Sequence, residues 1–364
     1  MKIRNRIAES ILGGIALLLT ACSGNLPADV DTGGTDSPGT PDEKGEPISI
    51  TFDMESAIQT RADGSTTTGT DEKMGDGKTF NIYVYDMASI TSIDQLDFSA
   101  PLASSTYTVN NVGGNLVATG NLKLYRGTYY MYLVSYNSDS EQPLLGKTSA
   151  TNESTGTDAI INVVNGKDFM YTTLPNVVVQ PQSSGSGIMS VKLPSPFQRL
   201  GSQVVVSAAK KNVIQPVEIQ ELEIDKITIK GLRSSLDYSL KNFKWNDNNT
   251  GFNADYTFYG SEFTRNEDDT RSPWISTAKV LLPVDGTKLL TFEVTLIISY
   301  RENGTMKTIT PTYEASMQKV LMPGTAYQFD FLLTFYGEII PADLTLAVKQ
   351  YDEIPLDSDG LGAD

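Results

Sequence analysis

Histidine is absent from the 364 residues of the chain, and cysteine occurs only once. Without histidine the chain cannot build a Ser/His/Asp or Cys/His catalytic site, and it lacks the commonest transition-metal ligand. A single cysteine also excludes an intramolecular disulfide. Basic residues are scarce, since 28 Lys and Arg stand against 44 Asp and Glu, and the formal net charge is −16. This balance argues against a nucleic-acid partner, because phosphate binding depends on Lys and Arg.

Glycoside hydrolysis by paired carboxylates needs no histidine, so the composition alone does not exclude it. The two carboxylates must face each other across a cleft, however, and no sequence pattern here predicts such a pair. The acidic segment 266–270 (NEDDT) has oxygen ligands for calcium, but it is short and lacks a bidentate glutamate at the proper spacing. It fits a solvated hairpin tip better. We therefore expect no catalytic residue, no metal site, no cofactor and no enzymatic activity.

Long hydrophobic runs are absent apart from one near the N-terminus. Residues 1–21 place three basic residues ahead of the apolar run 11–19, which is too short to span a bilayer, and they predict a secretory signal. The run leads into Leu-Thr-Ala-Cys, which ends at Cys22. This motif resembles the lipobox of bacterial lipoproteins, which implies that Cys22 carries three acyl chains after cleavage, enough for stable anchoring in a membrane. An ordinary signal peptide with an incidental cysteine is the alternative.

Apolar and polar residues alternate through most of the remaining chain. Residues 22–46 come first; they are rich in Gly, Pro, Ser, Thr and Asp and predict a flexible acidic tether. The next segment, 47–54, alternates strictly, and residues 290–300 alternate over eleven positions before the hairpin signal Asn303-Gly304. Because no comparably long stretch has a period of 3.6, the sequence predicts an all-β protein. One face of the first strand holds Ile48, Ile50, Phe52 and Met54.

Turn signals recur at the spacing typical of β-sandwiches, and they predict two domains. The polar stretch 180–187 precedes the predicted boundary, so we place the first domain at 47–195 and the second at 196–364. Within the second domain the alternation changes phase between Ile219 and Leu222. A change of phase within one strand predicts a β-bulge.

Five tyrosines fall within residues 125–136. Exposed aromatic rings stack on sugars, whereas aromatic rings on alternating strands usually fill a sandwich core or form cross-strand pairs. We favour the core interpretation for these tyrosines. A surface glycan-binding lipoprotein is the alternative function that the tyrosines and the lipobox also permit.

A polar segment with one arginine follows the first strand. Residues 57–69 consist largely of small polar residues around Arg61. Exposed loops of such residues are preferred sites of proteolysis, and an arginine provides a charged anchor for a trypsin-like protease. Cutting after Arg61 would detach the segment 47–61. Arg61 as a solubilising loop residue is the alternative.

The C-terminal end carries a strand with a similar pattern. Residues 344–351 place Leu344, Leu346 and Val348 on one face. If the strand at 48–54 completes the first domain's sheet, its release leaves a groove between unpaired strand edges, which are templates for another strand. The C-terminal strand of a neighbouring subunit fills this groove by β-strand addition. Because donor and acceptor surfaces differ, the contact repeats and builds a filament.

The lipobox, the acidic tether, the Thr-Arg-Ala segment at 60–62 and the closing run 321–351 together resemble the type V pilins, or fimbrillins, of Bacteroidales. The resemblance covers essentially the whole chain. It implies two transthyretin-like Greek-key β-sandwich domains in tandem. It also implies a lipidated precursor at the cell outer membrane, an arginine-specific protease that removes the N-terminal segment, and polymerisation by donor-strand exchange into an extracellular fimbrium.

Carried over to this chain, the resemblance implies that Cys22 is lipidated and that Arg61 and Ala62 form the scissile bond. The partners would be copies of the same subunit and accessory tip and anchor pilins. Because anchor subunits of such fimbriae lack the arginine site, Arg61 favours a stalk subunit, with an anchor or tip subunit as the alternative. The implied strand residues are Ile48, Ile50, Phe52 and Met54 in the removable strand and Leu344, Leu346, Val348 and Tyr351 in the donor strand.

Overall fold

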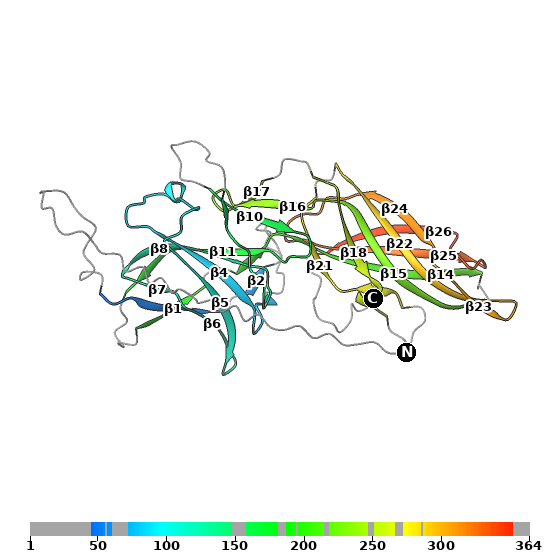
Figure 1. Ribbon diagram of the computed structural model, residues 1–364, viewed down its shortest axis with the longest axis horizontal. Coiled ribbons are helices and arrows are strands. Elements are labelled where there is room, and N and C mark those ends of the chain that lie inside the picture. The colour runs from blue at the N-terminus through cyan, green and yellow to red at the C-terminus, as the bar shows by residue number, and fades with distance from the viewer. Residues whose placement is uncertain are drawn as a thin grey trace, which may run out of the picture. The chain divides into compact units, whose positions relative to one another are not determined.

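Within the part of the chain that the structure describes, the regular elements are strands, apart from two three-residue 3-10 helices, η1 (Ile93–Gln95) and η2 (Gly260–Glu262) (Figure 1). The predicted all-β class, with sheets packed as β-sandwiches, is confirmed. Neither helix in this part of the chain is long and apolar enough to cross a membrane. The computed structural model describes residues 45–54, 57–59, 72–147, 158–180, 187–193, 196–214, 218–246, 251–265, 272–284 and 287–351.

An eleven-stranded sheet forms the first half of the fold. Its strands follow the order β12-β1-β6-β5-β4-β8-β11-β13-β2-β3, and β7 also pairs with β1. The strands are β1 (Ile48–Asp53), β2 (Ala57–Gln59), β3 (Glu72–Lys73), β4 (Thr79–Asp86), β5 (Ala103–Val112), β6 (Asn115–Gly120), β7 (Lys123–Leu124), β8 (Gly127–Ser135), β11 (Met170–Val179), β12 (Ile188–Lys192) and β13 (Phe197–Arg199).

This sheet closes around its own apolar face. Phe52 of β1 and Phe80 of β4 lie 5.9 Å apart between ring centroids, although two other strands separate β1 from β4 in the sheet. Phe197 of β13, still further along the strand order, lies 5.7 Å from Phe80. Side chains from distant strands of one sheet therefore meet in a single buried cluster, the first core.

A four-stranded sheet, β17-β16-β10-β9, covers the opposite face of β4 and β8. These central strands are buried on both faces, and Tyr132 of β8 stacks on Tyr171 of β11 with 5.5 Å between ring centroids. β10 precedes the predicted domain boundary at residues 195 and 196, β16 follows it, and the two strands pair. The position of the boundary stays a prediction. The strands of this sheet are β9 (Gly146–Lys147), β10 (Ala159–Val164), β16 (Ser235–Ser239) and β17 (Lys244–Trp245).

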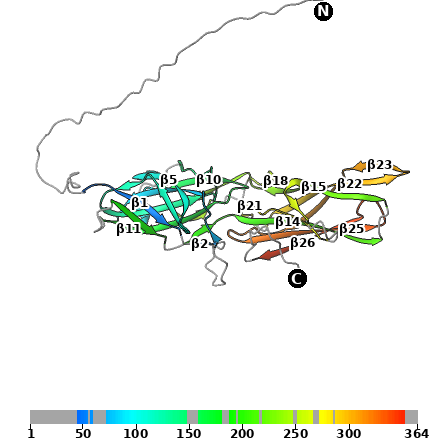
Figure 2. The same cartoon turned by 90° about the horizontal axis from the view of Figure 1, so that it is seen from below.

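Two sheets stack in the second half of the fold. One has the order β19-β20-β14-β25-β26 with β21 beside β14, and the other has the order β18-β15-β22-β23 with β24 beside β22. In Figure 2, β14, β25 and β26 lie side by side. Phe292 of β22 and Phe329 of β25 lie 4.8 Å apart between centroids, so the two sheets share one core, the second core. The strands are β14 (Ser202–Ile214), β15 (Ile219–Leu232), β18 (Ala254–Tyr259), β19 (Phe263–Thr264), β20 (Trp274–Ser276), β21 (Lys279–Leu281), β22 (Leu289–Glu302), β23 (Thr305–Ile309), β24 (Thr312–Gln318), β25 (Ala326–Tyr336) and β26 (Asp343–Tyr351).

Two local sequence signals in this sandwich are confirmed. Asn303 and Gly304 both have positive φ, 50° and 81°, as a two-residue hairpin between β22 and β23 requires. The register of β15 against β22 shifts between Ile219 and Glu221, where the change of alternation predicts a β-bulge. Both features depend on a few consecutive residues, which is why the sequence reveals them.

A buried ion pair ties β13 to the loop before β11 and allows a test of the packing. The Arg199 side chain is 1% exposed and donates from Nε to Asp168 Oδ1 at 2.6 Å and from Nη2 to Oδ2 at 2.7 Å. Removing one partner of a buried pair costs about 3–5 kcal/mol, because it leaves the other charge buried without its counter-ion. We expect Asp168→Ala to lower the free energy of unfolding by about 3 kcal/mol, measured by urea denaturation.

Glu141→Ala is the matched control for this prediction. Glu141 pairs with Lys167, and both side chains of that pair are substantially exposed. Exposed pairs contribute about 0–1 kcal/mol, so the loss should stay below about 1 kcal/mol. Equal losses in the two variants would contradict the structural role of the buried pair.

Candidate strand-exchange site

The alternation of residues in β1 appears in the structure as an alternation of burial. Ile50, Phe52 and Met54 are fully buried in the first core, and Ile48 is 4% exposed. The strand residues between them are partly exposed. The structure thus places together the four residues predicted for the removable strand, and it makes them part of the core. That the strand can be removed stays a prediction.

β1 has strand partners on both sides. It pairs in parallel with β12 over five positions, Ser49–Asp53 against Ile188–Lys192. On its other side it pairs antiparallel with β7 and β6, and the Ile50 N–H donates to the Leu122 carbonyl at 3.1 Å. In the part of the chain that the structure describes, β12 pairs with no strand but β1. Removal of β1 would leave a gap one strand wide, here called the β1 groove, with unpaired main-chain groups on both sides.

Tyr107 of β5 lines the β1 groove and contacts two residues of β1. Its ring lies 5.0 Å from that of Phe52, between centroids, and its hydroxyl donates to the Ile50 carbonyl at 2.8 Å. Burial raises the pKa of the Tyr107 phenol well above its ordinary value. Sequence reasoning missed this residue, because nothing in its neighbourhood distinguishes it from the other tyrosines among the 17 in the chain.

Residues 57–59, the first part of the predicted polar loop, form a short strand, β2. β2 pairs in parallel with β13 at Phe197 and Gln198, and antiparallel with β3. The sequence predicted residues 57–59 to lie in the loop around Arg61. That prediction was wrong for these three residues, which form a strand. The reason is the available edge of β13, which lies far along the chain and leaves no mark in the local sequence.

Several predicted site residues lie outside the described residues. They include the lipidation residue Cys22 and the two residues of the scissile bond, Arg61 and Ala62. The acidic segment 266–270 also lies outside them. In the chain, Arg61 falls between the end of β2 and the start of β3.

The predicted donor strand, β26, is an edge strand of the second sandwich. It pairs with β25 over nine positions and has no strand on its other side among the residues described. Leu344, Leu346 and Val348 pack against the second core and stay partly exposed. Tyr351 ends the strand opposite Ala326. Because β1 and β26 belong to different sheets, the structure does not bring the two predicted strands together within one chain.

The tyrosines at 125–136 lie mostly in the cores. Tyr129, Tyr130 and Tyr132 are buried, which confirms the core interpretation for these three, whereas Tyr125 is 44% exposed. No group of three or more side chains that could hold a metal ion occurs within the described ranges.

The chain resembles several solved structures. A protein from Bacteroides fragilis, provisionally described as a cell adhesion protein, aligns with a TM-score of 0.49 at 16% identity, over 85% of this chain and 99% of that chain. A similarly described protein from Bacteroides uniformis gives 0.43 at 11%, over 84% and 97%. The tip fimbrial protein Mfa3 from Porphyromonas gingivalis, with a C-terminal truncation, gives 0.36 at 9%, over 85% and 100%. No protein-family model and no curated protein matches the chain. Because these TM-scores are below 0.5, the function of the site is inferred from this chain's own contacts.

The pH dependence of stability tests the contact between Tyr107 and β1. The unfolded-state pKa of tyrosine is about 10, and burial raises the folded-state value above it. Tyr107 therefore contributes stability that is present below about pH 10 and is lost as the pH rises through the folded-state pKa. Above about pH 10, we expect the free energy of unfolding of the native chain to fall more steeply than that of Tyr107→Phe, by about 1.4 kcal/mol per pH unit, measured by urea denaturation.

Tyr125→Phe serves as the control, because this residue is 44% exposed, and the variant should have the same profile as the native chain. Parallel profiles for the native chain and Tyr107→Phe would show that the Tyr107 hydroxyl is not held in the buried state described.

Proposed function

We propose that this protein is a structural subunit of a surface fimbria, of the stalk class, which polymerises by strand exchange between neighbouring subunits. The observation that carries the proposal is the position of β1. An N-terminal strand, followed in the chain by the segment that contains Arg61, supplies fully buried side chains to the first core.

The β1 groove would hold β26 more firmly than its own sandwich does. Among the described strands of the sandwich, β26 pairs with β25 alone, and its three apolar side chains are only partly buried. At the position of β1, strands lie on both sides and the inward side chains are buried almost completely. Completing the burial of a half-buried aliphatic side chain contributes on the order of 1 kcal/mol. Main-chain hydrogen bonds along the second edge add to this, so exchange is favourable once β1 has left.

Cleavage is the trigger in this mechanism. In the intact chain β1 stays tethered to β2 and rebinds its groove at a high effective concentration. A cut between Arg61 and Ala62 separates both strands from the rest of the chain, because β2 ends at Gln59. The released segment then dissociates by dilution, and the donor strand of another subunit takes its place.

The remaining steps follow from the same proposal. Cys22 carries lipid that holds the precursor in the cell outer membrane, and an arginine-specific protease acts on it there. Leu344, Leu346 and Val348 of β26, with Tyr351 at its end, enter the β1 groove of the next subunit. The product joins copies of itself and accessory tip and anchor pilins in an extracellular fimbrium. This role needs no catalytic residue and no cofactor.

Treatment of the purified precursor with an arginine-specific protease should produce a ladder of oligomers, because each released β1 leaves an acceptor for another subunit's β26. Electrophoresis of unheated samples measures the ladder. Arg61→Ala should abolish it. Arg126→Ala, which removes an exposed arginine between β7 and β8, should leave it intact. Oligomers that form equally well without cleavage would contradict the proposal.

A disulfide that fastens β1 separates cleavage from strand release. Ser49 of β1 and Lys123 of β7 are opposed, and the hydrogen bond from Ile50 to Leu122 makes them a non-hydrogen-bonded pair. Such pairs have Cα atoms about 4.5 Å apart, which suits a disulfide. In a Cys22→Ser chain that carries Ser49→Cys and Lys123→Cys, we expect the protease to cut, but no ladder until a reductant is added.

Ser299→Cys with Thr308→Cys provides the matched control. These residues are opposed in the β22–β23 hairpin of the second sandwich, remote in sequence and in sheet from β1. This variant should form the ladder with or without reductant. A ladder from the oxidised Ser49→Cys/Lys123→Cys chain would show that β1 need not leave, and it would overturn the mechanism.

A further inference from the structure

Part of the edge of β15 in the second sandwich has no strand partner among the described residues. β15 pairs with β22 along most of its length, but on its other side β18 covers it only from Lys226 onward. β14 pairs with β25 to its end, but on its other side strand pairing stops at Ala208. Gly260 of η2 lies against the carbonyl groups of Ile224 and Asp225. Among the described residues, the segment 219–223 therefore presents an open main-chain edge.

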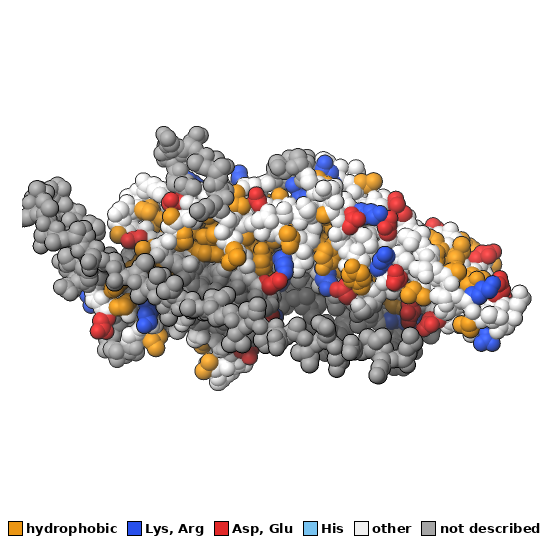
Figure 3. Space-filling view, viewed as in Figure 1, with side chains coloured by type: hydrophobic (Ala, Val, Ile, Leu, Met, Phe, Trp, Pro, Cys, Tyr) orange, Lys and Arg blue, Asp and Glu red, His pale blue; other side chains and the backbone are white. Residues whose placement is uncertain are grey.

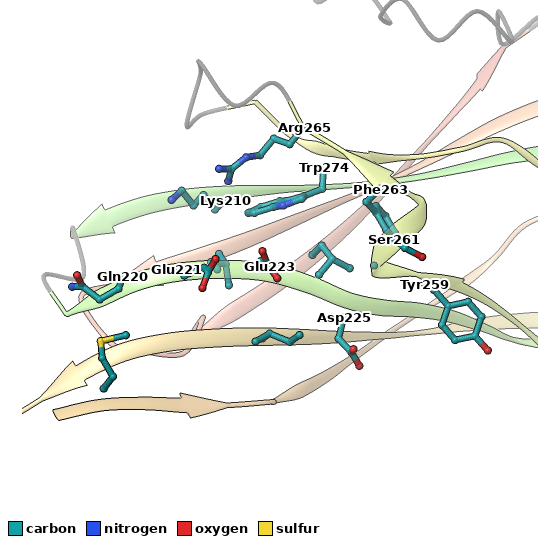
Figure 4. Close-up of a pocket in the computed structure, with 15 residues that line it drawn as sticks. Lys210, Gln220, Glu221, Glu223, Asp225, Tyr259, Ser261, Phe263, Arg265 and Trp274 are labelled. Atoms are coloured by element: carbon teal, nitrogen blue, oxygen red, sulfur yellow. The ribbon is translucent and has the colours of Figure 1, made fainter.

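A groove of about 1020 Å³ lies along the open edge of β15 and extends to β14 (Figure 4). It is here called the β15 groove. Leu222 and Ile224 of β15 line it and are almost completely buried, as is Trp274 of β20. Phe263 of β19 adds a partly buried ring. The Arg265 side chain lies over the Trp274 ring, with 4.9 Å from Cζ to the ring centroid. An apolar wall thus adjoins main-chain groups that have no strand partner.

Carboxylates follow the open edge at alternate positions. Glu221 and Glu223 are exposed and alternate with the buried Leu222 and Ile224. Neither carboxylate forms an ion pair within the part of the chain that is described. Across the groove, Figure 4 shows Lys210 with Arg265 and Trp274 on the side of β14. Elsewhere the half of the surface that contains β22 and β23 mixes acidic and basic side chains (Figure 3).

We propose that the β15 groove binds an extended segment of another protein in which aliphatic residues alternate with lysine or arginine. The segment adds to the open edge of β15 through main-chain hydrogen bonds. Residues opposed in neighbouring strands share a face of the sheet, with Cβ atoms about 4.5–5.5 Å apart. The aliphatic side chains of the segment therefore meet Leu222, and its basic side chains meet Glu221 and Glu223.

Charge favours this occupant over two candidates from the chain itself. Residues 352–364, which follow β26, contain five acidic and no basic residues, so they repel the carboxylates of the β15 groove. Pairing with β15 of a second copy would bring Glu221 and Glu223 against like charges, which is unfavourable for opposed residues. A basic and aliphatic segment has neither penalty at the β15 edge, and Lys210 and Arg265 lie across the groove on the side of β14. The β15 groove is separate from the β1 groove, and the inference does not depend on strand exchange.

Calorimetric titration of the full-length protein with synthetic nine-residue peptides tests the proposal. A peptide that alternates valine and lysine should bind, and its binding should change the fluorescence of Trp274, assessed against Trp274→Phe. A peptide that alternates valine and glutamate should bind at least about tenfold more weakly. Methylation of the main-chain nitrogens of the valine–lysine peptide should abolish binding, because strand addition needs its N–H donors.

Charge reversal supplies the matched variants. Glu221→Lys with Glu223→Lys should weaken the valine–lysine peptide at least about tenfold and make the valine–glutamate peptide the better ligand. Glu338→Lys, which reverses an exposed carboxylate after β25, should change neither affinity. Because the preference inverts, loss of the fold does not explain the result. Equal binding of the two peptides, a preference that survives the reversal, or self-association through β15 that excludes the peptide would overturn the proposal.

Discussion

The pairing of β1 with β12 on one side and with β6 and β7 on the other is the interaction on which the rest of the first half depends. A strand of six residues stands inside the sheet, and β12 has no other partner among the described strands. Phe52 packs edge-on against the stacked rings of Phe80 and Tyr107, and the Ile50 carbonyl accepts a hydrogen bond from the buried Tyr107 hydroxyl. One short segment therefore completes both a hydrogen-bonded ladder and an apolar core.

β1 and β26 have similar sequence patterns, but their sheets bind them with different free energies. Both present aliphatic side chains at alternate positions, so their sequence patterns are alike. β1 is paired on two edges and its inward side chains are buried, whereas β26 is paired on one edge and its inward side chains stay partly exposed. Free energy of strand association follows the buried area and the paired main chain, not the pattern alone. In the proposed mechanism, this difference gives strand exchange its direction.

Local signals in the sequence account for much of the fold. The alternation in β1 and β22, the Asn303-Gly304 turn and the bulge after Ile219 each depend on neighbouring residues, and each is present in the structure. The pairing of residues 57–59 with β13 escaped the same reasoning, because its partner lies far along the chain. The sheet that joins β10 to β16 and the contact between Tyr107 and β1 are non-local in the same way.

The sequence by itself determined that the chain is all-β, which face of each long strand is apolar, and where a basic residue follows the first strand. These properties follow from residue type and spacing, which set local backbone preference and amphipathicity. Only the tertiary structure decided that β1 is an interior strand, that β26 is an edge strand, and that part of β15 has an open edge beside a groove. The number of neighbours that a strand acquires is set by which distant segments pair with it, and that choice is made by the packing of the whole sheet.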